Sequence, residues 1–106
     1  MTGLQSDQVL IVLNVPPSLE EAVIDWLLAR DDGTGFTSFP VFGHGARHSN
    51  LSAAEQVSGR ERRQQFQVQL DVAAADPFLH DIEQSFGTAG IRFWSLPLNA
   101  SGHFTA

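Results

Sequence analysis

The sequence contains no cysteine, no lysine and no tyrosine among its 106 residues. Without cysteine, the chain cannot form disulfides, thiolate metal sites or a cysteine nucleophile. All six basic residues are arginines, and twelve acidic residues give a net charge of -6. Because a negatively charged surface repels phosphate backbones, we expect no nucleic-acid partner.

Long apolar runs are also missing. No stretch reaches the roughly 18 apolar residues that mark a membrane span, and the polar start MTGLQSDQ does not resemble a secretory signal. These patterns predict a cytoplasmic protein without direct membrane insertion. A chain of this length with 42% hydrophobic residues is expected to form one domain over residues 1–106.

Two segments have the pattern of central strands. Residues 8–15 (QVLIVLNV) form a continuous apolar run, which is typical of a strand buried on both faces. Residues 63–72 alternate apolar side chains with glutamines and an aspartate, which predicts a strand that covers a core with one face. The apolar set is Phe66, Val68, Leu70 and Val72.

Two further strands are predicted at the edges of the sheet. Residues 36–42 (FTSFPVF) and 90–98 (GIRFWSLPL) are rich in aromatic and β-branched residues, but they contain Pro40 and Pro97. Proline cannot donate a hydrogen bond to a neighbouring strand, which confines such segments to edges or bulges.

Helices are predicted after the first and third strands. In residues 16–30 (PPSLEEAVIDWLLAR), Ser18 and Glu21 have the spacing of a capping box, and apolar residues follow at helical spacing. Their stripe consists of Leu19, Ala22, Val23, Trp26 and Leu27. In residues 76–87, Asp76–Pro77 suits the start of a second helix. Its apolar face consists of Phe78, Leu79, Ile82 and Phe86.

The element order βαββαβ predicts an α+β fold of the ferredoxin-like type. In this arrangement the first and third strands of a four-stranded antiparallel sheet are central, and both helices cover one face. The uncovered face would expose Phe, Trp and Leu side chains of the edge strands, which favours oligomerisation through that face. The glutamines of residues 63–72 would lie there too, with amides bonded to one another or to water.

The connection between the second and third strands, residues 43–62, is unusually long, and such connections are often functional. It contains His44 between two glycines, and the cluster GRERR at its end. A polar tail, expected to be flexible, occupies about residues 99–106.

Four quoted stretches resemble the PII-like superfamily, to which the nitrogen regulatory protein P-II belongs, and most closely a PII-like family often associated with heavy-metal efflux genes. They are PPSLEEAVIDWLL, GFTSFPVFGHGARH, LSAAEQVSGRERRQQFQV and AGIRFWSLPL, and they cover most of the chain from Val9 to Leu98. The resemblance implies a homotrimer with its sheets facing inward and ligand clefts between subunits. It also implies that residues 43–62 are a T-loop, which docks on a protein target such as a membrane transporter.

The resemblance would also imply nucleotide binding, but the basic residues for it are missing. PII proteins hold ATP or ADP with glycine, lysine and arginine residues, because a polyphosphate needs convergent amides and cations. The segments that we compare with those loops, AAADPFL and NASGHFTA, contain no lysine or arginine. We therefore expect a ligand other than a nucleotide, and no certain cofactor.

Histidines suggest a divalent transition metal such as zinc, copper or nickel as one such ligand. His44, His48 and His103 are the candidate ligands, and in a PII-like trimer His103 would approach a neighbouring loop base. Glu55 could add an oxygen ligand. The alternative is that these histidines are simply solvated.

The loop and its base supply the candidate ligand or partner residues. These are Gly43, His44, Gly45, Arg47, His48, Glu55, Arg60 and Arg62. Gly43 and Gly45 suit positive φ angles at a strand exit or close approach of a ligand. The arginines of GRERR, at positions 60, 62 and 63, suit an anion, an acidic partner or a solvated loop end.

The sequence thus predicts a regulatory PII-like trimer that senses a small ligand or metal ion and docks on a target through its T-loop. The alternative is a CutA-like metal-binding protein that handles heavy metals. We expect no enzymatic activity, because the acidic residues lie in helix caps, helix surfaces and turns rather than as a pair in a pocket.

Overall fold

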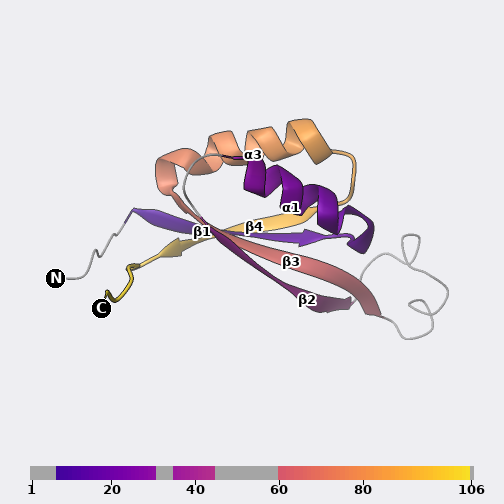
Figure 1. Ribbon diagram of the computed structural model, residues 1–106, viewed down its shortest axis with the longest axis horizontal. Coiled ribbons are helices and arrows are strands. Elements are labelled where there is room, and N and C mark those ends of the chain that lie inside the picture. The colour runs from indigo at the N-terminus through magenta and orange to yellow at the C-terminus, as the bar shows by residue number, and fades with distance from the viewer. Residues whose placement is uncertain (1–6, 31–34, 45–59, 106) are drawn as a thin grey trace.

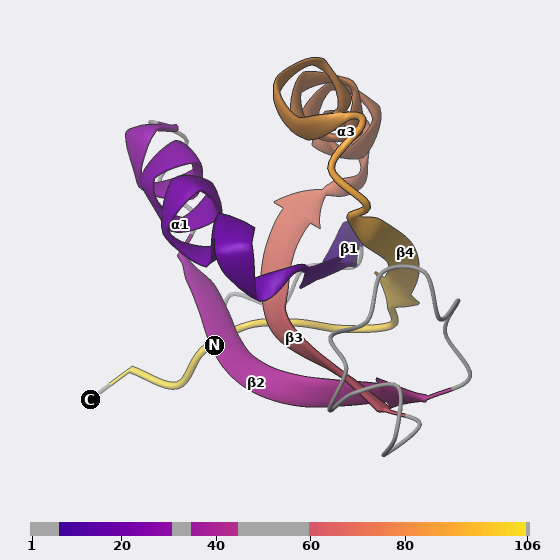
Figure 2. The same ribbon diagram turned by 90° about the vertical axis from the view of Figure 1, so that its right-hand side faces the viewer.

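The computed structural model describes residues 7–30, 35–44 and 60–105. It has an α+β fold in which two α-helices pack on one face of a four-stranded antiparallel sheet (Figures 1 and 2). The elements are β1 (Gln8–Val15), a 3-10 turn (Pro17–Leu19), α1 (Glu20–Ala29), β2 (Phe36–His44), β3 (Arg60–Asp71), α3 (Val72–Phe86) and β4 (Arg92–Leu98).

The strand order is β2-β3-β1-β4, so β1 and β3 are central. All three pairings are antiparallel. The prediction from the prolines is confirmed, because β2 with Pro40 and β4 with Pro97 lie at the edges. Central position also explains the unbroken apolar run of β1, since Val12 is only 3% exposed although it lies outside the main core cluster.

The core lies between the sheet and the helices. It combines alternate residues of β1 and β3 with one stripe of each helix. Its buried members are Val9, Ile11, Leu13, Val15, Val23, Leu27, Phe66, Val68, Leu70, Ala75, Phe78 and Ile82. The alternation predicted for β3 is confirmed for Phe66, Val68 and Leu70.

Trp26 joins the two helices at the edge of this core. Its ring packs edge-on against Phe78 and Phe86, with centroid distances of 5.7 and 6.2 Å. The indole Nε1 donates a hydrogen bond of 3.1 Å to the Ser85 hydroxyl, and the Arg30 guanidinium lies 4.8 Å from the ring centroid. Ala22, expected on the same stripe, is exposed.

The start of α1 differs from the prediction. Ser18 does not cap the helix, because it lies inside the 3-10 turn, whose cap position is taken by Pro16 with φ -56° and ψ 143°. The Leu19 amide donates to the Pro16 carbonyl at 2.9 Å, and α1 begins only at Glu20. The two prolines therefore set the tight first turn, and no capping box forms.

The start of α3 also differs. The helix begins at Val72, four residues before the predicted cap, and Pro77 lies inside it. The strand pattern does not extend to Val72, whose side chain is 55% exposed and whose amide donates to the Asp7 carbonyl at 2.8 Å. Three alanines, which favour helix strongly, carry the helix across residues 73–75. AAADPFL is thus helical and is not a ligand-binding loop.

Neither α-helix in the described part of the chain is long and apolar enough to span a membrane.

Candidate functional site

The facing ends of β2 and β3 form a two-stranded stem. His44 pairs with Arg60, Gly43 with Glu61 and Phe42 with Arg62. The connection predicted for residues 43–62 is therefore shorter than expected, because the strands continue into it at both ends. Four of the predicted site residues lie in the stem: Gly43, His44, Arg60 and Arg62. The other four, Gly45, Arg47, His48 and Glu55, lie outside the described residues.

Gly43 does not have the positive φ that the sequence suggested. Pairing with Glu61 holds its backbone in the strand, and among the described residues only Gly90 has a positive φ, of 82°. A Cβ on Gly43 would lie 3.8 Å from the Glu61 carbonyl oxygen, which is an ordinary contact. The glycine in the stem is therefore not required by backbone conformation, whereas the glycine of the α3–β4 turn is.

The arginines of the stem are engaged in different ways. Arg63 forms an ion pair with Glu61, and both side chains are largely buried. Arg63 Nη1 also donates to the Gly90 carbonyl at 3.4 Å, which ties β3 to the α3–β4 turn. The guanidinium of Arg60 lies 4.7 Å from the centroid of the Phe42 ring. Arg60 is exposed although it lies over the Phe42 ring, whereas Arg63 is largely buried, so the expectation of a solvated loop end is wrong for Arg63.

A cavity of about 410 Å³ lies beside the stem. It joins three segments that are distant in sequence: the β1–α1 connection, the start of β3 and the α3–β4 turn. Its lining consists of Pro16, Pro17, Ser18, Glu61, Arg62, Arg63, Thr88, Ala89 and Gly90. Sequence reasoning identified Arg62 as a candidate but missed residues 16–18 and 88–90. The double proline and the GTAG turn were the available signals, but neither shows which strand it will approach.

The candidate metal ligands do not converge within one chain. His44 is exposed at the end of β2, whereas exposed His103 lies in the C-terminal segment, at the opposite end of the molecule (Figure 1). The described residues include no group of three histidine or acidic side chains that could hold a metal ion. A site that uses both histidines would therefore need neighbouring chains.

The open face, meaning the side of the sheet away from the helices, is the second notable surface (Figure 2). Cross-strand register places Trp94 beside Val12 and Leu96 beside Leu10 on this face. The side chains of Trp94 and Leu96 remain 39% and 47% exposed, as does Phe39 of β2 at 39%. The open face thus has an apolar strip on the β1–β4 side and an isolated aromatic residue at the other edge.

Amides occupy the middle of the open face and bond to one another, as the sequence predicts. Gln65 Nε2 donates to Asn14 Oδ1 at 2.9 Å, and Gln67 Nε2 donates to Gln65 Oε1 at 3.2 Å. Gln69 Nε2 donates to Gln8 Oε1 at 3.3 Å, and Gln8 in turn donates to Asp71. These bonds satisfy polar groups that would otherwise oppose burial of the face.

The C-terminal segment crosses the same side of the sheet (Figure 2). The Gln69 side chain reaches Ser101 Oγ at 3.0 Å, so residues after β4 are attached to β3. Beyond this contact, Phe104 is 95% exposed. The tail therefore begins as an ordered extension of the open face and ends in an unburied aromatic side chain.

Comparison with known proteins places this architecture in a family. The family described as "Protein of unknown function (DUF3240)" matches residues 5–105. The chain belongs to that family. Among solved structures, it is similar to a DUF3240 family protein from Shewanella baltica OS155, whose crystal structure was determined at 2.40 Å resolution.

That likeness covers 95% of this chain and 100% of the Shewanella chain, with a TM-score of 0.76 and 17% sequence identity. At this identity the DUF3240 structure supports the fold alone. No curated protein matches the chain.

Proposed function

We propose that this protein is a non-enzymatic regulatory protein of the PII-like type, with a ferredoxin-like arrangement of its βαββαβ elements. Three copies associate through their open faces, and the cavity beside the β2–β3 stem senses a small ligand or metal ion at the resulting clefts. The connection between β2 and β3 docks on a target protein, with a membrane transporter as the expected class. The number three comes from the sequence resemblance.

The observation that carries this proposal is the composition of the open face. It combines exposed Trp94 and Leu96 with amides that are already hydrogen-bonded within the chain. Burial of such a face gains the hydrophobic contribution of the apolar strip without leaving amide groups unpaired. Self-association is thus more favourable here than on a face with unsatisfied glutamines.

The cavity supports the sensing part of the proposal. Its mixed lining brings the basic side chains of Arg62 and Arg63 next to the α3–β4 turn. Arg63 is already paired with Glu61, and Arg62 also has an interaction within the chain, so a ligand would interact with polar groups of the turn and with the Arg62 guanidinium in addition to its existing contact. A small anion or a polar metabolite suits this lining better than an apolar molecule.

Light scattering on the purified protein, combined with calorimetry, tests the proposal. We expect a mass near three chains, and heat of binding for at least one of Zn²⁺, Cu²⁺, Ni²⁺ or a small anion such as phosphate, with none for ATP, ADP or AMP. For an anionic ligand, Arg62→Ala should remove the heat, whereas Arg60→Ala, in the same stem but outside the cavity, should retain it. A monomer at all concentrations would refute the assembly.

The same titrations test the metal-handling alternative. In that alternative His44 and His103 would come from neighbouring chains, because the end of β2 and the C-terminal segment lie at opposite ends of the molecule (Figure 1). His44→Ala should therefore abolish Zn²⁺ binding if these histidines form the site, while leaving the mass unchanged. Zn²⁺ binding that is retained in this variant would exclude His44 as a ligand.

A further inference from the structure

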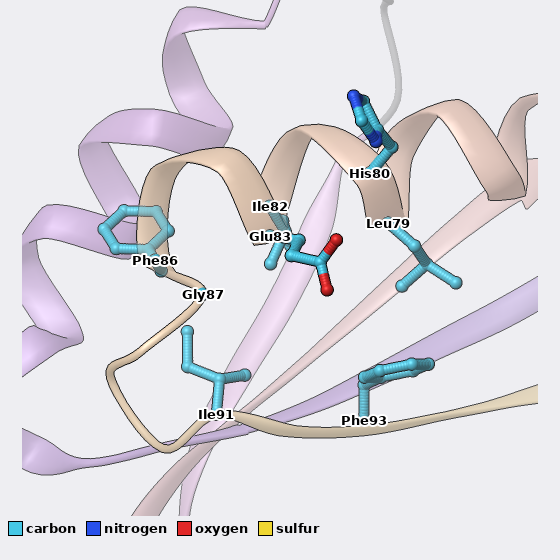
Figure 3. Close-up of a pocket in the computed structure, with 8 residues that line it drawn as sticks. All are labelled: Leu79, His80, Ile82, Glu83, Phe86, Gly87, Ile91 and Phe93. Carbon is cyan, nitrogen blue, oxygen red and sulfur yellow. The ribbon is translucent and has the colours of Figure 1, made fainter.

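A second cavity lies between α3 and the edge strand β4, on the helix side of the sheet (Figure 3). Its volume is about 270 Å³. Its walls are formed by the last two turns of α3, the following glycine and the residues leading into β4. They consist of Leu79, His80, Ile82, Glu83, Phe86, Gly87, Ile91 and Phe93.

One carboxylate interrupts this apolar lining. Figure 3 shows the Glu83 carboxylate in the gap between α3 and β4, near Leu79 and Phe93, whereas the His80 imidazole points away from β4. No lysine or arginine lines the groove. Asp81 on the same helix is neutralised by Arg30 at 3.1 Å, but Glu83 forms no ion pair with any residue that the structure describes.

The adjoining strand has an unpaired edge. Among the described strands β4 pairs only with β1, so its outer main-chain groups face away from the sheet. Phe93 lies level with core residue Leu13 on the helix side, yet it is 55% exposed because α3 does not cover it. Edge strands of this kind accept an additional strand from another chain.

We propose that the groove and the β4 edge together bind an extended peptide segment of a partner protein. The segment pairs with the main chain of β4 over residues 92–96, because Pro97 cannot donate beyond them. Its groove-facing side chains are apolar, with one lysine or arginine whose aliphatic stem lies on Leu79 and Phe93. The terminal cation of that side chain pairs with Glu83.

Charge and size favour this occupant. Glu83 is exposed at the groove, and a long basic side chain supplies both a cation that pairs with its carboxylate and an apolar stem that covers the walls. The cavity is close to the lower limit of about 300 Å³ for small-molecule sites, which suits one or two side chains. This inference does not depend on the proposed trimer, since the groove lies on the helix side of the sheet.

Nuclear magnetic resonance with the ¹⁵N-labelled full chain tests the inference. The probe is the acetylated, amidated peptide Ser-Leu-Thr-Lys-Thr-Val-Ser, with a second peptide in which Glu replaces Lys. We expect amide shifts confined to residues 79–87 and 91–96, and about tenfold tighter binding of the Lys peptide. Glu83→Lys should reverse this preference. Asp76→Lys, the same charge change on α3 outside the groove, should preserve it.

Three results would overturn the inference. The first is the absence of shifts, or shifts on the open face or β2 instead of the groove. The second is a preference for the Lys peptide that Glu83→Lys leaves unchanged, which would show that Glu83 does not pair with the basic side chain, or that Asp76→Lys alters equally, which would show that only the overall charge matters. The third is a concentration-dependent shift of residues 79–87, Ile91 and Phe93 without peptide and without shifts of Trp94 and Leu96 on the open face, which would identify a second copy of the chain as the occupant of the groove.

Discussion

Replacing Trp94 by serine tests whether the open face is the assembly surface. Trp94 lies on β4 beside Val12, on the side away from the helices, and 39% of its surface is exposed in the single chain. The main core cluster does not include it. The substitution should therefore weaken association much more than it weakens folding.

The size of the effect follows from the exposed area. A tryptophan has up to about 250 Å² of surface, so the exposed 39% corresponds to about 100 Å². At about 25 cal/mol per Å², its burial contributes roughly 2.5 kcal/mol per chain and about 7 kcal/mol per trimer. Because area converts incompletely to affinity, we expect the concentration at half-association to rise about 100-fold.

Sedimentation velocity over a wide dilution series measures this concentration directly. Leu28→Ser is the matched control, because Leu28 is 68% exposed on α1 and lies on the opposite side of the sheet. It should leave association unchanged, and both variants should retain the circular dichroism spectrum of the parent. If Trp94→Ser assembles at the parent concentration, the open face is not the assembly surface.

Three further substitutions test the packing, each measured by denaturant unfolding. Phe66→Ala removes a fully buried ring that packs edge-on against Phe36, and should lower the free energy of unfolding by about 3–5 kcal/mol. A loss below about 1 kcal/mol would contradict the central position of Phe66 in the core. Trp26→Phe keeps an aromatic ring but loses the hydrogen bond between helices and part of the Arg30 contact, and should cost about 1–2 kcal/mol. Arg63→Met leaves buried Glu61 unpaired and should lower the free energy of unfolding by about 3 kcal/mol. Adding Glu61→Met should recover most of that loss. Equal stability of the single and double variants would show that the ion pair is not buried in solution.

Side-chain alternation and proline placement predicted the sheet correctly. The glutamine and apolar alternation of β3 has period two and therefore specifies both faces without reference to the rest of the chain. Pro40 and Pro97 then distinguish edge from centre, because the missing amide donor acts in the same way in any fold.

Helix starts were predicted less well, because several local signals compete there. Ser18 has the spacing of a cap, but the preceding prolines form the turn first. Asp76–Pro77 has the composition of a helix start, but the alanines before it and the Asp7 carbonyl allow α3 to begin earlier. Each outcome depends on neighbouring backbone groups that the local pattern does not include.

The candidate site was predictable only in part. The length of the predicted connection between the second and third strands pointed to a site at the base of that connection, and Arg62 does line a cavity there. The groove at Glu83 was not predicted, because its walls come from α3 and from the strand after the turn, and Glu83 alone reads as an ordinary helix-surface residue. Tertiary contact between the two elements creates the site.

The amides that bond within the open face also affect how the single chain behaves in water before any proposed assembly. In a newly synthesised single chain, a sheet face that was apolar throughout would associate nonspecifically with other exposed strands. Asn14, Gln65 and Gln67 give the middle of this sheet polar groups that water can solvate while the chain is alone. Because these amides are already bonded within the chain, the proposed pairing of open faces requires no new amide partner, while the polar row limits nonspecific association of the single chain.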